Sequence, residues 1–238
     1  MRRAGQSVSL LATGAALLWI TTAGDEYLNY VRPGFRILII GAGAVLCALG
    51  GAGVVRDWRR RAEDPSGDGH GHGRGPGVAW LFLLPPLAIF AIAPSALGSF
   101  TASRALNQAA PPVDAGRSLG ALSPGGPARI SLTEFTARAF QARSGHDTLT
   151  GRQVVLTGFA APAGRDRWLL VRLRMTCCAA DAVPMRIAVT GVPAPAADRW
   201  VQVTGAWSPA WAKIHDVDTP RLTATAVRSV GKPSDPYE

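Results

Sequence analysis

The sequence predicts an α+β membrane protein in which N-terminal transmembrane helices precede a small, mainly β domain. Three observations predict this class. Hydrophobic residues make up 47% of the 238-residue chain and charged residues only 17%, whereas soluble globular proteins carry about 25% charged residues. The apolar excess gathers in three charge-free stretches near the N-terminus, and short strand-like runs follow them. The three cysteines are too few for a disulfide-rich secreted scaffold.

Each charge-free stretch is long enough to cross a hydrocarbon core of ~30 Å, which takes about 20 helical residues. We expect transmembrane helices over residues 8–28, 36–55 and 78–98. Arg2, Arg3 and five arginines between the second and third helices outnumber the two arginines in the first loop. The positive-inside rule therefore places the arginine-rich side in the cytoplasm. We predict a multi-pass plasma-membrane protein, embedded in the lipid bilayer, with an extracytoplasmic C-terminal region.

The N-terminus also resembles a signal peptide. Residues 1–23 combine a basic start, an apolar core and a weak cleavage site at Thr21-Thr22-Ala23. We favour an uncleaved anchor because this cleavage site is poor. Cleavage would leave the predicted orientation of the later helices unchanged.

Small residues form a stripe along the second predicted helix. Gly41, Ala44, Ala48 and Gly51 recur at helical spacing, which lets a neighbouring helix approach closely. We expect the first or third helix, rather than a partner protein, to pack there. Cys47 in the same helix is expected to be a packing residue.

Two linkers separate these predicted elements. Residues 59–77, RRRAEDPSGDGHGHGRGPG, are glycine-rich and polar without periodicity, which predicts a flexible cytoplasmic loop. His70 and His72 in this loop form a weak candidate metal site, since two imidazoles on a flexible chain bind a transition metal loosely. Residues 99–128 are rich in Ala, Pro, Gly and Ser and predict a tether, with 119–122 a candidate short strand.

Residues 129–238 predict the extracytoplasmic β domain. Ser131 or Thr133 can cap a short helix that runs through Phe140. Five strand-like runs follow, each bounded by Pro, Gly or Asp; they cover residues 153–159, 168–175, 185–190, 200–207 and 221–230. Five short strands, with a helical turn between the second and the third, favour a closed barrel of the oligonucleotide/oligosaccharide-binding (OB) type. A β-sandwich would show similar spacing.

The strongest chemical signal is the sequence MTCCAADAVP at residues 175–184. Adjacent cysteines are unusual outside the cell, where thiols tend to be paired or consumed. Three interpretations stay open for Cys177 and Cys178. They could be small buried hydrophobic residues, or they could bind zinc or copper together with Asp181 and His215. They could also form a strained vicinal disulfide or a redox pair.

These residues carry a resemblance to a known family. The N-terminal spans, Y-V-R-P at residues 30–33, G-R-x-V-x-L-x-G-F at 151–159 and C-C-A-A-D-A-x-P at 177–184 are similar to the YcgQ-like family of uncharacterised bacterial membrane proteins. The resemblance covers nearly the whole chain, and its cysteine segment is the most specific part. It implies an accessory subunit of a predicted multi-span permease. It implies no activity, ligand or catalytic residue.

Two functions follow as hypotheses. The first is a non-catalytic permease subunit whose outer domain binds a solute or a metal ion. The alternative is a thiol-dependent metal chaperone or redox protein that acts through Cys177 and Cys178. A conventional hydrolase is not expected, because H-E-x-x-H and P-loop patterns do not occur in the sequence. No nucleic-acid partner is expected despite the net charge of +9, because the domain is predicted to lie outside the cell.

Overall fold

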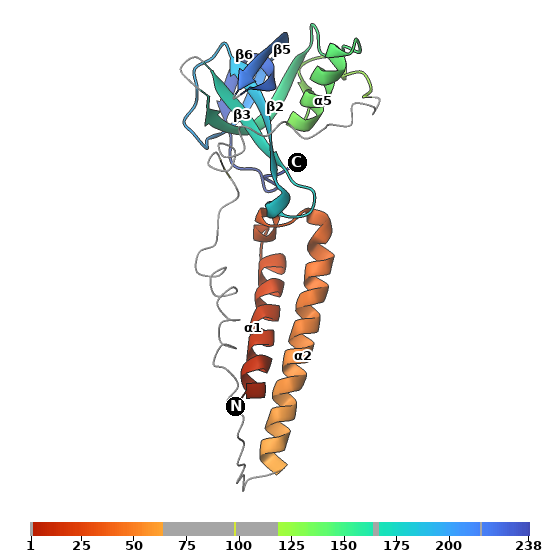
Figure 1. Ribbon diagram of the computed structural model, residues 1–238, viewed down its shortest axis with the longest axis vertical. Coiled ribbons are helices and arrows are strands. Elements are labelled where there is room, and N and C mark those ends of the chain that lie inside the picture. The colour runs from red at the N-terminus through yellow and green to blue at the C-terminus, as the bar shows by residue number, and fades with distance from the viewer. Residues whose placement is uncertain (1, 64–97, 99–118, 164–166, 215) are drawn as a thin grey trace. The chain divides into compact units, whose positions relative to one another are not determined.

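The computed structural model describes residues 2–63, 98, 119–163, 167–214 and 216–238 (Figure 1). The chain divides into two compact units, Met1–Ser95 and Ala96–Glu238. The described part of the first unit is a helical hairpin, and that of the second is a mixed β-sheet with one helix. Several sequence predictions lie outside the described residues: most of the third helix at 78–98, most of the tether at 99–128, and the candidate ligands His70, His72 and His215.

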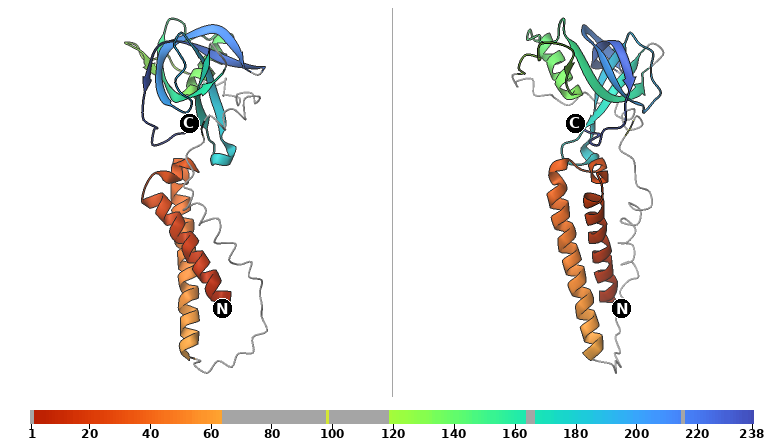
Figure 2. Two further views of the ribbon diagram at one scale, coloured as in Figure 1. Left: turned by 90° about the vertical axis from the view of Figure 1, so that its left-hand side faces the viewer. Right: turned by 180° about the vertical axis from the view of Figure 1, so that it is seen from behind.

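Helix α1 (Arg2–Thr22) and helix α2 (Arg36–Glu63) run side by side in opposite directions (Figure 2). Two 3-10 turns, η1 (Glu26–Asn29) and η2 (Pro33–Phe35), connect them. The predicted first helix, 8–28, was therefore misplaced, because α1 ends before Gly24 and residues 26–29 form a separate turn. Glycine destabilises a helix interior by about 1 kcal/mol, which favours an end at this point.

Helix α2 continues beyond the end predicted at residue 55 and includes residues 59–63, which the sequence analysis assigned to a flexible loop. That assignment was wrong at its start. Arginine, alanine and glutamate are strong helix formers, and the first helix-breaking residue in this segment is Pro65. The arginines at residues 56–61 therefore extend the apolar helix with a basic end.

Among the described residues, one helical segment, Pro33–Arg60, is long and apolar enough to cross a membrane. Its large apolar side chains lie on the outside: Ile37 is 80% exposed and Leu38 is 66% exposed. Such exposure is unfavourable in water and favourable in lipid. An apolar helix near the N-terminus fits either a membrane span or a signal sequence.

Close contact between the two helices depends on glycines. A Cβ atom added at Gly14 would lie 2.8 Å from the Gly43 carbonyl oxygen and 2.7 Å from Cys47 Sγ. A Cβ atom at Gly50 would lie 2.8 Å from the backbone nitrogen of Leu11. These distances are shorter than a carbon atom allows, so only glycine fits at either position. Cys47 packs against α1, as expected.

The predicted stripe on α2 is not the face that α1 covers. Within the described part of the chain, nothing lies within 4 Å of a Cβ atom added at Gly41 or Gly51, and Ala44 and Ala48 are exposed. Of the two helices expected to pack there, the first does not, and the third lies mostly outside the described residues. Small residues occur on two faces of α2, and spacing along one helix does not indicate which face another helix will cover.

The second unit contains a six-stranded mixed sheet. Its strands are β1 (Ala128–Arg129), β2 (Gln153–Pro162), β3 (Trp168–Arg174), β4 (Val183–Thr190), β5 (Trp200–Ile214) and β6 (Val217–Ser229). The strand order is β1-β2-β3-β4-β6-β5, and β2 also pairs with β5. The β4–β6 pair is parallel, whereas β3–β4 and β5–β6 are antiparallel. All five predicted strands are present, and the added short strand is β1 rather than 119–122.

Helix α5 (Leu132–Arg143) packs against β2, β3 and β4. Ser131 caps it, as one of the two predicted caps, and its Oγ accepts a hydrogen bond of 2.9 Å from the Glu134 N–H. The N–H groups of Leu132 and Thr133 donate to the Glu238 carboxylate at 2.9 and 2.8 Å. A carboxylate at this end satisfies free N–H groups and complements the positive end of the helix dipole.

The segment that contains Glu238 also holds the end of β3. The Glu238 N–H donates to the Leu173 carbonyl at 2.9 Å, and the Met175 N–H donates to the Glu238 carbonyl at 3.0 Å. The Arg172 guanidinium donates to the Tyr237 carbonyl at 3.2 Å. The backbone is therefore tied on both sides of the point where β3 ends and the cysteine segment begins.

Substitution of Gly50 by leucine should weaken the helical hairpin, because the new side chain would meet the Leu11 backbone. We expect a lower midpoint of thermal unfolding for the full chain in mild detergent, with a cost of about 1–3 kcal/mol. Gly41→Leu adds the same volume in open space and should leave the midpoint unchanged. An equal loss of stability in both variants would contradict the packing described above.

Candidate metal centre

The connection between β3 and β4 carries the predicted cysteines. The two strands are antiparallel, with Arg174 opposite Val183, so the connection leaves and re-enters the same end of the sheet. Met175 at its start is 1% exposed and packs in a core cluster with Leu173 and Ile214. Burial of such a side chain contributes about 1.5–3 kcal/mol. The cysteine loop is therefore anchored at its start in the hydrophobic core of the domain.

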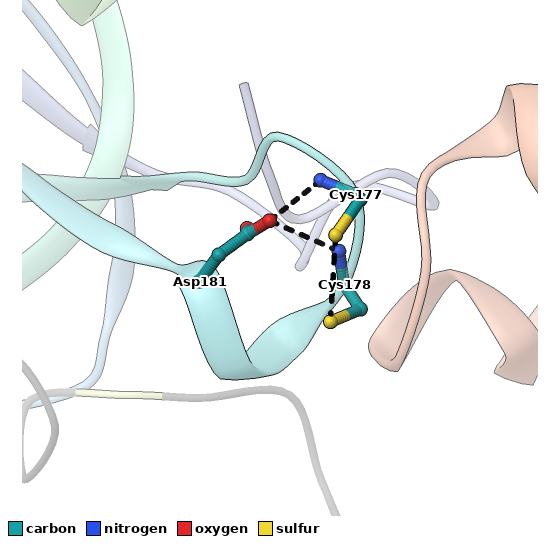
Figure 3. A group of neighbouring side chains, drawn as sticks. All are labelled: Cys177, Cys178 and Asp181. Atoms are coloured by element: carbon teal, nitrogen blue, oxygen red, sulfur yellow. Dashed lines mark hydrogen bonds between the residues drawn. The ribbon is translucent and has the colours of Figure 1, made fainter.

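Asp181 organises the loop through backbone hydrogen bonds (Figure 3). Its Oδ1 accepts from the Thr176 N–H at 2.9 Å. Its Oδ2 accepts from the Cys177 N–H at 2.8 Å and from the Cys178 N–H at 3.5 Å. Aspartate commonly closes short loops in this way, because its side chain reaches nearby N–H groups in place of a backbone acceptor. These three N–H groups converge on one carboxylate, and the backbone bends around it.

Both thiols lie beside this carboxylate. The sulfur atoms of Cys177 and Cys178 are 3.7 Å apart, and both cysteines are free thiols. One potential ligand atom from each of Cys177, Cys178 and Asp181 lies within 4.8 Å of the others. Cys177 is exposed, and Cys178 and Asp181 are half-buried. The interpretation of both cysteines as buried hydrophobic residues was therefore wrong for Cys177.

The carboxylate keeps the Cys177 thiol protonated. The hydrogen bond from this thiol to Asp181, together with the contact to Cys178, raises the pKa of Cys177 from 9.0 to about 11. The same thiol hydrogen bond and the N–H of Thr176 lower the pKa of Asp181 from 3.8 to about 2. At neutral pH Asp181 is therefore charged and Cys177 is a thiol. A reactive cysteine has the opposite property, a lowered pKa.

Two sulfurs and a carboxylate form a ligand set that zinc and related transition metals accept. Each thiol must lose its proton when a metal binds. The backbone N–H groups that hold Asp181 would orient this ligand, as groups behind metal ligands commonly do. The loop therefore has the donors and the local support of a small metal site on the surface of the domain.

The sequence predictions for the site have different outcomes. Cys177, Cys178 and Asp181 come together, as the metal interpretation required. His215, proposed as a further ligand, and the loop pair His70 and His72 lie outside the described residues.

The sequence analysis missed the residues that support the loop, above all Arg172, Tyr237 and Glu238. Arg172 and Tyr237 lie 65 residues apart in the chain, and no short motif connects them. The isolated bridge between Leu173 and Tyr237 and the backbone hydrogen bonds of Glu238 bring their segments together.

Residues 116–120, GRSLG, have the G-x-S-x-G spacing of a nucleophile elbow. That elbow requires a helix directly after the serine. Residues 119–127 contain neither helix nor strand, so the pattern does not meet this requirement. We assign it no role.

Residues 133–238 match the family described as DUF1980 C-terminal domain, an uncharacterised family. The matched region includes the cysteine loop and the strands of the sheet from β2 onward. No curated protein and no solved structure matches the chain.

The raised pKa of Cys177 predicts slow alkylation of this thiol by iodoacetamide. Because only the thiolate reacts, the rate in a metal-free Cys178→Ser full chain should still be rising between about pH 9 and pH 10. Asp181→Asn removes the charge that opposes thiolate formation. It should lower the pKa of Cys177 and raise the rate near pH 8, about tenfold for each pKa unit.

Tandem mass spectrometry of the alkylated peptide measures this rate separately from that of Cys47. A rate that levels off below about pH 9, or no change in Asp181→Asn, would show that the carboxylate does not control this thiol.

Proposed function

We propose that this protein is a membrane-anchored, non-catalytic accessory protein whose C-terminal domain binds a transition-metal ion, zinc or copper. Cys177, Cys178 and Asp181 are the proposed ligands. The observation that carries the proposal is the convergence of their three ligand atoms within 4.8 Å on an accessible loop. Thiolates suit zinc and copper, and a carboxylate completes a site that zinc accepts readily.

The binding step needs no oxidant or reductant. A divalent ion displaces the thiol protons of Cys177 and Cys178 into solvent and forms bonds to both sulfurs and to one oxygen of Asp181. The ion takes the place of the proton that the Cys177 thiol shares with the Asp181 carboxylate. The folded loop already holds the three donors together, so little ordering remains when the ion arrives.

A redox function is the alternative that the same cysteines suggest. It receives less support, because the hydrogen bond to Asp181 raises the pKa of the Cys177 thiol, whereas redox-active cysteines have lowered pKa values. The three-donor cluster also includes a carboxylate, which a dithiol redox pair does not need. Metal binding uses all three residues.

The proposal takes the outer domain to be an OB-like barrel. Support comes from the strand pairings, since β2 pairs with both β3 and β5, and β4 pairs with β6. An OB barrel has five strands and binds ligands through its loops and one face. The cysteine loop connects the second and third of these five strands.

We further propose that the N-terminal helices anchor the chain in the plasma membrane, with the β domain on the extracytoplasmic side. The exposed apolar side chains of α2 and its basic end at Arg56, Arg59 and Arg60 support this orientation. In this arrangement the domain would carry the ion to or from a multi-span permease, as the resemblance to the YcgQ-like family implies. No nucleic acid takes part.

The full chain, purified in mild detergent and exposed to zinc, should retain one equivalent that depends on the cysteines. The double variant Cys177→Ser/Cys178→Ser should lose that equivalent, because serine does not supply a thiolate. Cys47→Ser is the matched control and should retain it. Elemental analysis after desalting measures the stoichiometry, and circular dichroism checks folding.

Zinc on the glycine-histidine loop would add to the total, but His70→Ala/His72→Ala would remove that part alone. Equal retention by the parent chain and the cysteine double variant would disprove the site.

The permease hypothesis predicts a stable complex in the membrane. A multi-span membrane protein encoded beside this chain should co-purify with it in mild detergent, and a bulky residue at Gly41 or Ala48 on the open face of α2 should reduce the recovery. Gly14→Leu disrupts the contact between the two helices. Comparison with this variant shows whether a reduced recovery of the complex results from misfolding of the hairpin. A complex that never forms at native expression would refute an accessory role.

A further inference from the structure

We infer that the ion bound by Cys177, Cys178 and Asp181 is a tetrahedral divalent cation of the zinc class, with its fourth coordination position open to a ligand from outside the chain. This inference rests on the proposed metal site. It specifies which ion the site takes and what the site does with it. The argument starts from the distance between the two sulfur atoms.

The sulfur separation discriminates between coordination geometries. Two thiolates at about 2.3 Å from one ion lie about 3.75 Å apart at the tetrahedral angle, about 4.6 Å apart in a linear arrangement and about 3.25 Å apart at a right angle. In the metal-free loop, the contact between Cys177 Sγ and Cys178 Sγ is 3.7 Å, so the tetrahedral arrangement requires the least movement of the sulfurs. Linear coordination, the arrangement typical of two-thiolate copper(I), would require the sulfurs to separate by about 0.9 Å.

The third donor favours the same ion. Copper(I) selects soft sulfur ligands, whereas zinc also accepts carboxylate oxygen. Asp181 lies within 4.8 Å of both thiols, and N–H groups of Thr176 and Cys177 hold its two oxygens in place. A carboxylate offers about four acceptor positions, so those hydrogen bonds leave room for a bond to a metal. The loop therefore places a hard donor where a linear copper(I) site would have none.

The number and the location of the donors indicate an open site. Within the described part of the chain, the donor group has three members, all from the five-residue segment 177–181. Cys177 is exposed. Structural zinc sites use four protein ligands, whereas catalytic zinc sites use three and leave the fourth position to water or substrate; three protein ligands therefore leave the fourth position accessible here as well. The fourth position would hold water until a donor from another protein or a small molecule replaces it.

An open fourth position makes the ion cargo rather than a structural cofactor. An incoming ligand can bind the ion before the protein ligands leave, so the ion never has to be released free into water. The exposed loop gives a partner access to the ion without unfolding the domain. A site of this kind suits delivery of zinc to an acceptor, or its capture from a donor.

X-ray absorption at the zinc edge tests the coordination directly. The sample is the full-length His70→Ala/His72→Ala variant with one equivalent of zinc. We expect two sulfurs at about 2.3 Å and two oxygen or nitrogen atoms at about 2.0–2.2 Å. Addition of a small monothiol should raise the sulfur count from two to three, because it replaces the external ligand. His215→Ala should leave the spectrum unchanged.

Asp181→Asn should weaken zinc binding by at least tenfold while both sulfurs remain in the spectrum. Asp218→Asn is the matched control, because this carboxylate pairs with Arg143 elsewhere on the surface; it should change nothing. If Asp181→Asn binds zinc as tightly as the parent chain, the carboxylate is not a ligand and the inference is wrong.

Failure of this inference differs from failure of the proposed function. Four sulfurs shared between two copies, two sulfurs without lighter atoms, or a closed site that loses a ligand in His215→Ala would overturn the open tetrahedral site and retain metal binding. Zinc without any sulfur neighbour would overturn both.

Discussion

The Asp181 carboxylate accepts hydrogen bonds from the N–H groups of Thr176, Cys177 and Cys178, and the rest of the candidate site depends on this contact. It bends the chain so that two consecutive cysteines present their sulfurs on the same side. It also receives the Cys177 thiol hydrogen bond, which keeps this thiol protonated. One carboxylate thus folds the loop, keeps a thiol protonated and lies where the proposed metal site needs its third ligand.

The sheet stabilises the conformation of the cysteine loop. Met175 is buried at the start of the loop, and the antiparallel β3–β4 pair controls both of its ends. Glu238 connects the same place to the start of helix α5 through its side chain and its backbone. Consequently the loop can expose Cys177 to solvent without losing its conformation. Accessibility and a fixed loop conformation are what the proposed metal site requires.

The sequence allowed much of the fold to be predicted. Alternation in β3 and the Pro, Gly and Asp residues between strands located all five long strands, and Ser131 was correctly proposed as a cap for the following helix. The site was predicted in part, since Cys177, Cys178 and Asp181 lie within one short segment. The role of Asp181 as an acceptor for backbone N–H groups was missed, because spacing does not reveal which way a side chain turns.

By itself the sequence determined the properties that depend on neighbouring residues: the apolar length of α2, the strand segments and the pairing of two thiols with a carboxylate four residues later. Only the tertiary structure decided that α1 covers Gly43 and Gly50 rather than Gly41 and Gly51, and that β2 pairs with β5. It also placed the Glu238 carboxylate at the N-terminus of α5 and the two sulfurs 3.7 Å apart. These features arise from contacts between distant segments or from the exact turn of the backbone, and local composition and periodicity carry no information about either.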